Sequence, residues 1–326
     1  MLTVLKPGLE TTVQDWPGLK GAFRYGFNAS GPVDHWSFRL ANLLVGNAAG
    51  APGLEAQFIG PTLKFETDGW FAIAGADMRP KLDGEPVTMW QTTTAKAGQT
   101  LSLGPALSGA RTYIAFAGGI AAKPFLGSCA THPMAAAGGL DGRKLAAGDA
   151  IPLNPADTPA PHSAPEAIRP VISSTGRWDI EVVVGPSDDW VSDAGHKLFF
   201  ATDWGVSAKA NRMGIRLDGP ELLFAERALN KAPEHGSHPS NCVDIGYPFG
   251  GINLCGDTPV ILLNEGLTLG GFIVPYTVPT AAFPKLGQAR PNEVFRFHPI
   301  SVADAQAMRR QISDICRPQS LVPTGA

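Results

Sequence analysis

Three groups of polar residues lie among glycines in this chain, and each could form part of a binding or catalytic site. The first falls in residues 8–34, GLETTVQDWPGLKGAFRYGFNASGPVD. The second is KANRMGIRLDG, residues 209–219, and the third is HGSHPSNCVDIGYPFGGINLCGDTP, residues 235–259. Glycine lets a backbone approach a ligand closely, and consecutive exposed N–H groups can hold an oxyanion. These groups therefore predict a site for a polar or anionic small molecule.

Several side chains in these groups have two interpretations each. Arg212 could bind a carboxylate or carbamate through paired hydrogen bonds, or it could be an ordinary surface residue. Asp244 or Asp257 could orient an N–H donor. Asn211 and Asn241 could contact a ligand or only serve turns with positive φ.

The opening stretch has the same ambiguity. Asp15 and Asn28 could contribute to a pocket, but Asp15 could equally be a turn former. Asp34 stands directly before an apolar helical pattern, where its carboxylate can satisfy free backbone N–H groups as a helix cap. The stretch has no helix or strand period, so we interpret it as a conformationally demanding loop that crosses a barrel and leads the chain to this helix.

The histidines and cysteines predict no metal site. His235 and His238 are three residues apart and could share a metal only on a helix, which the flanking glycine and proline disfavour. The cysteines form no CxxC pair, and Cys242 and Cys255 are expected to be small buried apolar residues rather than reactive thiols. All four are expected to be reduced: Cys129, Cys242, Cys255 and Cys316.

Common cofactor and nucleophile motifs are absent from the sequence. It contains no GxxxxGK[ST] or GxGxxG unit, no HExxH or GxSxG, and no lysine in the Met-Lys-Met setting of a biotin carrier. A partner is therefore expected to supply any cofactor or energy source.

Composition bounds the class of protein. With 326 residues, 38 glycines, 29 prolines and 44% hydrophobic residues, the chain is expected to form two domains rich in short strands and tight turns. The net charge of −3 without a basic stripe argues against nucleic acid or anionic membrane as a partner. The N-terminus does not resemble a signal peptide, and no apolar run is long enough to span a bilayer, so a cytoplasmic location is expected.

Apolar patterning predicts mainly β structure with a few helices. A helix is expected from about His35 to Val45, ended by Gly46, and a C-terminal helix from a capping box at Ser301 and Asp304. Its apolar face is expected to hold Val302, Ala305, Met308, Ile312 and Ile315. Expected strands are Leu63–Glu66, Trp70–Ala74, Thr100–Leu103, Thr112–Phe116, Asp179–Val184, Val260–Leu263 and Gly271–Pro275, with a short helix at Asp193–Thr202.

The proline- and alanine-rich stretch PADTPAPHSAPEAIRP is the best linker candidate. We therefore expect a first domain at 1–155, a linker at 156–170, a second domain at 171–300, and a C-terminal helix and tail at 301–326. GPTLKF at 60–65 weakly echoes GPELLF at 219–224, which suggests two related barrels.

Taken together, PGLETTVQDWPG, SGPVDHWSFRLANLLVGN, LEAQFIGPTLKF, AIAGADMRPKLDG, GGIAAKPFLGSCAT and GGLDGRKLAAGD resemble the paired-barrel carboxyltransferase family. That family includes allophanate hydrolase subunit 2-like proteins, KipA-type proteins and the third subunit of 5-oxoprolinase. The resemblance covers Leu2 to about Ser301. In the second half, the HPSN…GGINLCGDTP region looks like the carboxyltransferase part of urea and guanidine carboxylases.

The resemblance implies two cyclophilin-like β-barrel subdomains and a companion subunit of the allophanate hydrolase subunit 1 or KipI type. It implies a biotin carboxylase and a carrier bearing carboxybiotin, with ATP used by a partner and no cofactor bound covalently to this chain. The expected reaction moves CO2 from carboxybiotin to urea, guanidine or a related amide nitrogen. The alternatives are the third subunit of an ATP-dependent 5-oxoprolinase, which hydrolyses a lactam, and a KipA-type partner of a kinase regulator.

For this chemistry we expect Arg212 to clamp an anion, Asp244 or Asp257 to orient the acceptor N–H, and Tyr247 to relay a proton. The predicted catalytic residues are Arg212, Asn241, Asp244, Tyr247 and Asp257. The predicted substrate-binding residues are Asn211, Ser240, Gly256, Gly270, Gly271, Asp15 and Asn28, and no metal ligand is predicted.

Two departures from the family pattern bear on the site. The turn Gly127-Ser128-Cys129-Ala130-Thr131 lacks the arginine and serine that the family usually has there, which removes an expected anion contact. Met213 stands where the urea carboxylases often have threonine.

Overall fold

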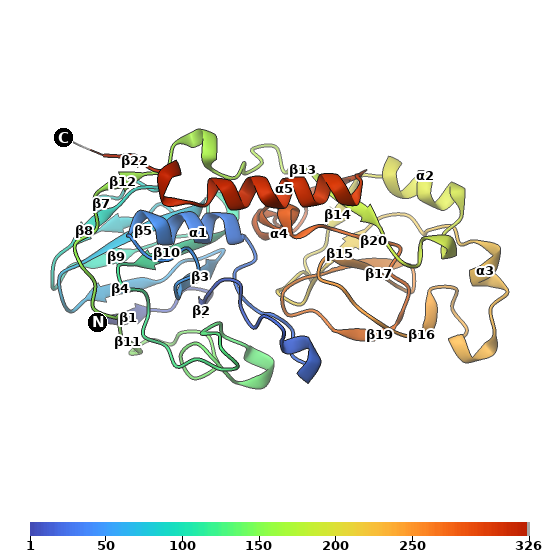
Figure 1. Ribbon diagram of the computed structural model, residues 1–326, viewed down its shortest axis with the longest axis horizontal. Coiled ribbons are helices and arrows are strands. Elements are labelled where there is room, and N and C mark those ends of the chain that lie inside the picture. Colours follow the sequence, from blue (N-terminus) through green and yellow to red (C-terminus); the bar gives the residue numbers. More distant parts are fainter. Residues whose placement is uncertain (325–326) are drawn as a thin grey trace. The chain divides into compact units, whose positions relative to one another are not determined.

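The computed structural model describes residues 1–324, which fold into two compact units (Figure 1). The first unit comprises residues 1–22, 29–172 and the C-terminal stretch from 312. The second comprises residues 23–28 and 173–311. The stretch expected to be a linker, 156–170, therefore lies within the first unit. There β12 (His162–Ser163) pairs with β22 (Val322–Pro323).

The first unit is built from two antiparallel sheets that share one core. Alternating apolar residues of both sheets face each other, including Leu63 and Phe65 from one and Ile73 and Ile114 from the other. The six-stranded sheet has the order β11 (Ala150–Ile151), β1 (Leu2–Lys6), β4 (Thr62–Phe65), β9 (Thr100–Ser102), β6 (Lys81–Leu82), β7 (Glu85–Pro86). The five-stranded sheet has the order β2 (Glu10–Gln14), β3 (Gly53–Gln57), β10 (Ser108–Phe116), β5 (Gly69–Asp77), β8 (Thr93–Ala95).

The predicted helix after the opening stretch is confirmed as α1 (His35–Leu44). Asp34 caps it, because its carboxylate accepts hydrogen bonds from the Ser37 N–H at 3.0 Å and the Ser37 hydroxyl at 2.6 Å. Leu40 and Leu44 are fully buried. Gly46, with φ of 75°, follows the last turn as expected for a helix end.

Buried polar side chains fix the opening stretch before this helix. The Gly31 N–H donates to the Gln14 side chain at 2.9 Å. The Val33 N–H donates to Glu55 at 3.0 Å, and the Asp34 N–H donates to the Tyr113 hydroxyl at 2.8 Å. Side chains thus satisfy part of the backbone of residues 31–34, whereas the expected absence of a strand is wrong for Glu10–Gln14, which form β2 in a ladder with β3.

The second unit contains a closed seven-stranded barrel. Its first strand, β13, pairs in parallel with β21, and the other pairs are antiparallel. Around the ring the order is β13 (Arg177–Val184), β20 (Tyr276–Thr277), β17 (Gly251–Cys255), β18 (Thr258–Leu262), β15 (Gly214–Asp218), β14 (Trp204–Val206), β21 (Val294–Pro299). A separate two-stranded sheet joins β16 (Asn241–Gly246) to β19 (Leu269–Phe272).

Helices are few, in agreement with the mainly β class expected. They are α2 (Asp193–Ala201), α3 (Glu226–Leu229), α4 (Phe283–Gln288) and α5 (Val302–Ile315), in addition to α1. Ser301 and Asp304 form the predicted capping box at α5, with the Asp304 N–H donating to the Ser301 hydroxyl at 3.1 Å. The predicted apolar face of α5 is wrong at its start, because Val302 is 58% exposed, whereas Ile312 is buried.

Two other sequence expectations are corrected. The strand expected at Gly271–Pro275 is β19, which begins and ends earlier because its partner is β16. The echo between 60–65 and 219–224 has no structural counterpart: the first segment contains β4, whereas the second follows β15 without forming a strand. Within residues 1–324, no helix has the length and apolar character needed to cross a membrane.

Candidate functional site

A pocket of 210 Å³ lies on the outer face of the second unit's barrel. Arg216 of β15 pairs with Val260 of β18, and Val260 pairs with Asn253 of β17, so these three side chains stand in one row across three strands. Their neighbours Ile215 and Ile261 alternate inward and are buried in the barrel. The full lining is Lys209, Asn211, Met213, Gly214, Arg216, Tyr247, Asn253, Cys255, Val260, Leu262, Leu267 and Phe272.

Phe272 of β19 also lines this pocket, together with Tyr247, which follows β16, and Leu267, which precedes β19. Tyr247 packs with Leu262 and Val274 in a small apolar cluster that Phe272 joins. Gly270 must be glycine here, because a Cβ at this position would lie 2.7 Å from the Tyr247 hydroxyl. The glycine therefore lets the Tyr247 ring pack directly against β19.

Tyr247 and Asn253 form the buried polar floor of the pocket. The Phe272 N–H donates to the Tyr247 hydroxyl at 2.8 Å, and the Asn253 amide also hydrogen-bonds this hydroxyl. Burial raises the pKa of Tyr247, so the group stays a neutral hydroxyl at neutral pH. Asn253 is only 4% exposed, and its Oδ1 has no hydrogen-bond partner among residues 1–324. Since buried polar atoms are nearly always paired, this oxygen is a candidate ligand contact.

Two cations, Lys209 and Arg216, complete the lining, and no carboxylate belongs to it. Both side chains are exposed, and neither has an ion-pair partner in the part of the chain described. The pocket therefore combines two positive groups, a polar floor and apolar walls. This arrangement suits a small molecule that is neutral or negatively charged.

Arg212 stands between the lining residues Asn211 and Met213 in the sequence but does not itself line the pocket. Its guanidinium is buried and pairs with Glu265, with Nε 2.6 Å from Oε1. The Glu265 N–H donates to the Arg212 carbonyl at 3.1 Å, so the pair ties the 209–214 turn to the loop before β19. This burial disagrees with the exposed anion clamp and with the surface residue that the sequence suggested.

Asn211 does line the pocket, and its side chain also shapes the turn. Its Oδ1 accepts the Met213 N–H at 2.8 Å and the Gly214 N–H at 3.3 Å. Asn211 therefore closes the turn and borders the pocket; the turn with positive φ expected here is wrong, because Asn211 is not among the residues with positive φ, and its contact with a ligand stays a prediction.

Four predicted residues gather around His238 instead of the pocket. The Asn241 Oδ1 accepts the His238 N–H at 3.1 Å, and the Ser240 hydroxyl lies 2.8 Å from His238 Nδ1. Asp257 Oδ1 lies 3.4 Å from His238 Nε2. Gly256 precedes Asp257 in the turn between β17 and β18. These residues anchor the 235–241 loop to the barrel.

Asp244 and Gly271 face each other across β16 and β19, where a Cβ on Gly271 would lie 3.4 Å from the Asp244 carboxylate. Asp244 is exposed and does not line the pocket. The neighbouring Cys242 has its pKa raised mainly by burial, which keeps it a thiol. The four cysteines are free, as expected, and no cluster of metal-ligating side chains occurs within residues 1–324.

Asp15 and Asn28 lie outside the pocket lining. Asp15 belongs to the first unit, where its carboxylate accepts the Ser128 hydroxyl at 2.5 Å and the Cys129 N–H at 2.6 Å. It thus holds the turn that departs from the family pattern. Burial raises its pKa, although these hydrogen bonds oppose the shift. Asn28 belongs to the second unit, where its Nδ2 donates to the Gly266 carbonyl at 3.4 Å.

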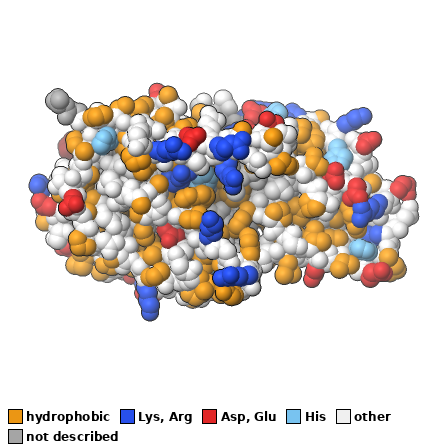
Figure 2. Space-filling model, viewed as in Figure 1, with side chains coloured by type: hydrophobic (Ala, Val, Ile, Leu, Met, Phe, Trp, Pro, Cys, Tyr) orange, Lys and Arg blue, Asp and Glu red, His pale blue; other side chains and the backbone are white. Residues whose placement is uncertain are grey.

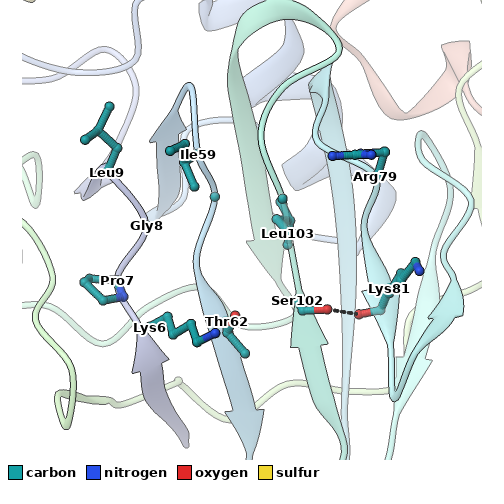
Figure 3. A pocket seen from close by; sticks show the side chains of 12 residues that line it. Lys6, Pro7, Gly8, Leu9, Ile59, Thr62, Arg79, Lys81, Ser102 and Leu103 are labelled. Carbon is teal, nitrogen blue, oxygen red and sulfur yellow. Dashed lines mark hydrogen bonds between the residues drawn. The ribbon is translucent and has the colours of Figure 1, made fainter.

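The first unit has a larger groove of 690 Å³, shown in Figure 3. Lys6, Arg79 and Lys81 border it together with the exposed apolar residues Leu9 and Ile59. None of its lining side chains has a buried polar atom without a partner. Basic side chains occur elsewhere too, and Figure 2 shows them on one face of the molecule together with acidic ones. The smaller pocket on the barrel is therefore the better site candidate.

The sequence interpretation missed Asn253, Arg216 and Lys209. A usable signal existed for Asn253, because it is the one polar side chain in the strand run GINLC, between Ile252 and Leu254. In a strand with a buried inner face, such a residue must point outward. Nothing local indicates that β16 and β19 then cover it.

Comparisons with known proteins place this chain among carboxyltransferase domains. The family model described as "Carboxyltransferase domain, subdomain A and B" matches residues 25–299. The chain is 37% identical to urea amidolyase of Saccharomyces cerevisiae over 315 residues, which are 94% of this chain and 17% of that protein. It is 34% identical to the third 5-oxoprolinase subunit of Escherichia coli over 272 residues, 83% of this chain and 82% of that one.

A solved structure is also similar to this chain. The crystal structure of Kluyveromyces lactis urea carboxylase matches with a TM-score of 0.93 and 35% identity, covering 99% of this chain and 30% of that one. The chain thus spans less than a third of the length of the urea amidolyase and urea carboxylase that it matches. It spans most of the length of the 5-oxoprolinase subunit.

Proposed function

The chain belongs to the family of the carboxyltransferase domain, subdomain A and B, and from this membership we propose that it forms one half of a biotin-dependent carboxyltransferase. The proposed acceptor is an amide-type nitrogen such as that of urea. The companion half, the biotin carboxylase and the biotin carrier would come from partner subunits or domains. The identity to proteins named urea amidolyase and urea carboxylase supports this choice.

The observation that carries the proposal is the pair of pocket cations that have no ion-pair partner within residues 1–324. A carboxyl group in transit is anionic, and Lys209 and Arg216 offer two positive charges with no competing carboxylate in the lining. Carboxybiotin, when a carrier delivers it, would supply the activated carboxyl group. The apolar walls Val260, Leu262 and Phe272 would reduce water around the reacting groups and so strengthen these charges.

The chain's own residues would hold and orient the acceptor. In the net reaction, the acceptor nitrogen would form a bond to the carboxyl carbon, the bond between that carbon and the biotin nitrogen would break, and the proton that the acceptor loses would end on biotin. Tyr247 is a neutral hydroxyl, so it can pass a proton only by accepting one as it gives up its own. Arg212 would act as a positioning residue, because its pairing with Glu265 fixes the turn that carries Lys209 and Asn211.

Reconstitution tests this proposal. The chain would be combined with a companion subunit, a biotin carboxylase and a biotinylated carrier, and fixation of labelled bicarbonate would be measured with and without urea. Urea-dependent fixation that avidin abolishes is the expected result. Fixation that proceeds equally without the chain would contradict the proposal.

A second candidate, the third subunit of an ATP-dependent 5-oxoprolinase, has its own support. The 34% identity to the 5-oxoprolinase relative covers most of both chains. In that case ATP-driven formation of glutamate from 5-oxoproline would be insensitive to avidin. A role as a KipA-type partner of a kinase regulator would instead give kinase inhibition without turnover of either substrate.

A further inference from the structure

The groove of the first unit holds a row of four polar side chains, one from each of four neighbouring strands. Lys6 of β1 pairs with Thr62 of β4, which pairs in turn with Ser102 of β9. Ser102 pairs with Lys81 of β6, and Figure 3 shows the four residues following one another across the groove. Leu63, next to Thr62, is buried in the core, so the row lies on the outer face of the sheet.

Positive charge stands at both ends of this row. Lys6 and Lys81 are exposed, and the exposed Arg79 borders the same groove. Within residues 1–324, none of the three forms an ion pair, and the lining contains no carboxylate. Asp77 lies outside the lining, and its carboxylate accepts the backbone N–H of Arg79 at 2.7 Å. The groove is therefore a positively charged surface that the described chain does not neutralise.

Glycines leave the floor of the groove without side chains. Gly8 has φ of 76°, and a Cβ there would lie 2.4 Å from the Ile59 carbonyl oxygen. A Cβ on Gly60 would lie 2.4 Å from the Cβ of Leu103. Apolar side chains beside this floor stay exposed, Leu9 at 51% and Ile59 at 42%. A ligand that covers them would remove apolar surface from water, which favours binding.

The spacing of the cations indicates the class of ligand. Neighbouring strands lie about 4.8 Å apart, so the backbones at Lys6 and Lys81, three strand intervals apart, are about 14 Å from each other. Acidic side chains about four residues apart in an extended chain have the same separation, because each residue advances the chain by about 3.4 Å.

The openness of the groove also favours an extended chain over a small anion. Small-molecule sites enclose most of their ligand, whereas this groove of 690 Å³ is bordered by exposed side chains. A small anion would reach only one end of the row. An extended segment reaches both ends and also covers the exposed apolar side chains.

We propose that this groove binds an extended acidic segment of a partner protein, which lies across β1, β4, β9 and β6. Two carboxylates of the segment, four residues apart, would meet Lys6 and Lys81 at the ends of the row. Groups between them would hydrogen-bond the hydroxyls of Thr62 and Ser102, and an apolar side chain would cover Leu9. The inference goes beyond the proposed function and does not depend on it, because it concerns residues of the first unit alone.

Fluorescence anisotropy with the purified full chain tests this proposal. The probe is a fluorescein-labelled peptide of seven residues, with two glutamates four residues apart and leucine and serine between them. One control peptide has the same composition with the two glutamates adjacent, and a second has lysines in place of the glutamates. We expect saturable binding of the probe that weakens about fivefold or more between about 50 and about 500 mM NaCl, because salt screens exposed ion pairs. The peptide with adjacent glutamates should bind about threefold more weakly or less, and the lysine peptide should not bind.

Variants of the chain locate the site. Lys6→Gln with Lys81→Gln should weaken binding of the probe by about fivefold, since each exposed ion pair contributes about 1.5- to 5-fold. Lys20→Gln with Lys123→Gln removes the same charge at exposed lysines of the first unit outside the groove and should bind as the wild type does. Leu9→Ser should weaken the probe at low and high salt alike, because it removes apolar rather than charged contact.

Three results would overturn the inference. The first is equal binding of the two glutamate peptides, and the second is equal binding of the probe by the Lys6→Gln, Lys81→Gln variant and its matched control. The third is full displacement of the probe by inorganic phosphate at constant ionic strength, because the groove would then be a site for a small anion. The peptide and phosphate comparisons use the wild-type chain, so they decide the matter even where a variant does not fold.

Discussion

Replacing Arg212 by methionine separates a structural ion pair from a substrate clamp. The Arg212 side chain is 4% exposed and the Glu265 side chain 7%, and their nearest atoms are 2.6 Å apart. Methionine keeps much of the volume but leaves the Glu265 carboxylate buried without its cation. Removing one partner of a buried pair costs about 3–5 kcal/mol.

The loss should be visible in thermal unfolding. For a domain of this size, a loss of about 3–5 kcal/mol lowers the midpoint by roughly 6–20 °C. The double variant Arg212→Met with Glu265→Leu should recover a large part of the loss, because the buried carboxylate that lost the Arg212 cation is removed as well. Arg227→Met, at an exposed cation of the same unit, is the control and should change stability by under about 0.5 kcal/mol.

The refuting result is simple to recognise. If Arg212→Met unfolded at the wild-type midpoint and yet abolished turnover, the side chain would be contacting substrate rather than holding two loops together. Equal losses in the single and the double variant would also refute the reasoning, since no coupling between the partners would then exist.

Three further predictions follow from single positions. Asp34→Ala should cost about 1–2 kcal/mol in denaturant unfolding, because two donors of α1 lose their acceptor; no loss would refute the cap. Gly270→Ala should destabilise the chain by about 1–3 kcal/mol by clashing with Tyr247, whereas Gly246→Ala on the paired strand meets nothing within 4 Å and should be nearly neutral; equal effects would contradict the packing. Asp15 has a raised pKa in the folded state, so its contribution to stability is full below its unfolded pKa and is lost as pH rises through the folded value. The free energy of unfolding of wild type and of Asp15→Asn would be compared by denaturation from pH 3 to 8. We expect wild type to lose stability relative to the variant as pH rises, and a difference that does not change with pH would refute the shift.

The parts of the fold that local chemistry dictates could be predicted from the sequence. Asp34 and Gly46 mark the two ends of α1, and Ser301 with Asp304 marks the start of α5, because caps act within one turn of the chain. The bounds expected for strand β19 are wrong, because the ends of this strand depend on its partner β16. An apolar run shows only that a strand is buried, not with which residues it pairs.

The site could be predicted only in part, for a related reason. Tyr247 and Asn211 line the barrel pocket, and their expected roles toward a ligand stay predictions. Arg212 has the residue type of an anion clamp, but its partner Glu265 is 53 residues away and no local pattern links them. Asn253 became a candidate only once the register set it beside Val260 and the missing donor was apparent.

The measurement that tests the account most directly is avidin-sensitive bicarbonate fixation by the reconstituted complex, with variants of the pocket cations. Lys209→Gln with Arg216→Gln should lower urea-dependent fixation by about a hundredfold, the order expected when charges that stabilise a developing anion are removed. Lys197→Gln, at an exposed lysine of the same unit outside the pocket, should fix bicarbonate at the wild-type rate. Undiminished fixation by the double variant would place the reaction elsewhere and contradict the account.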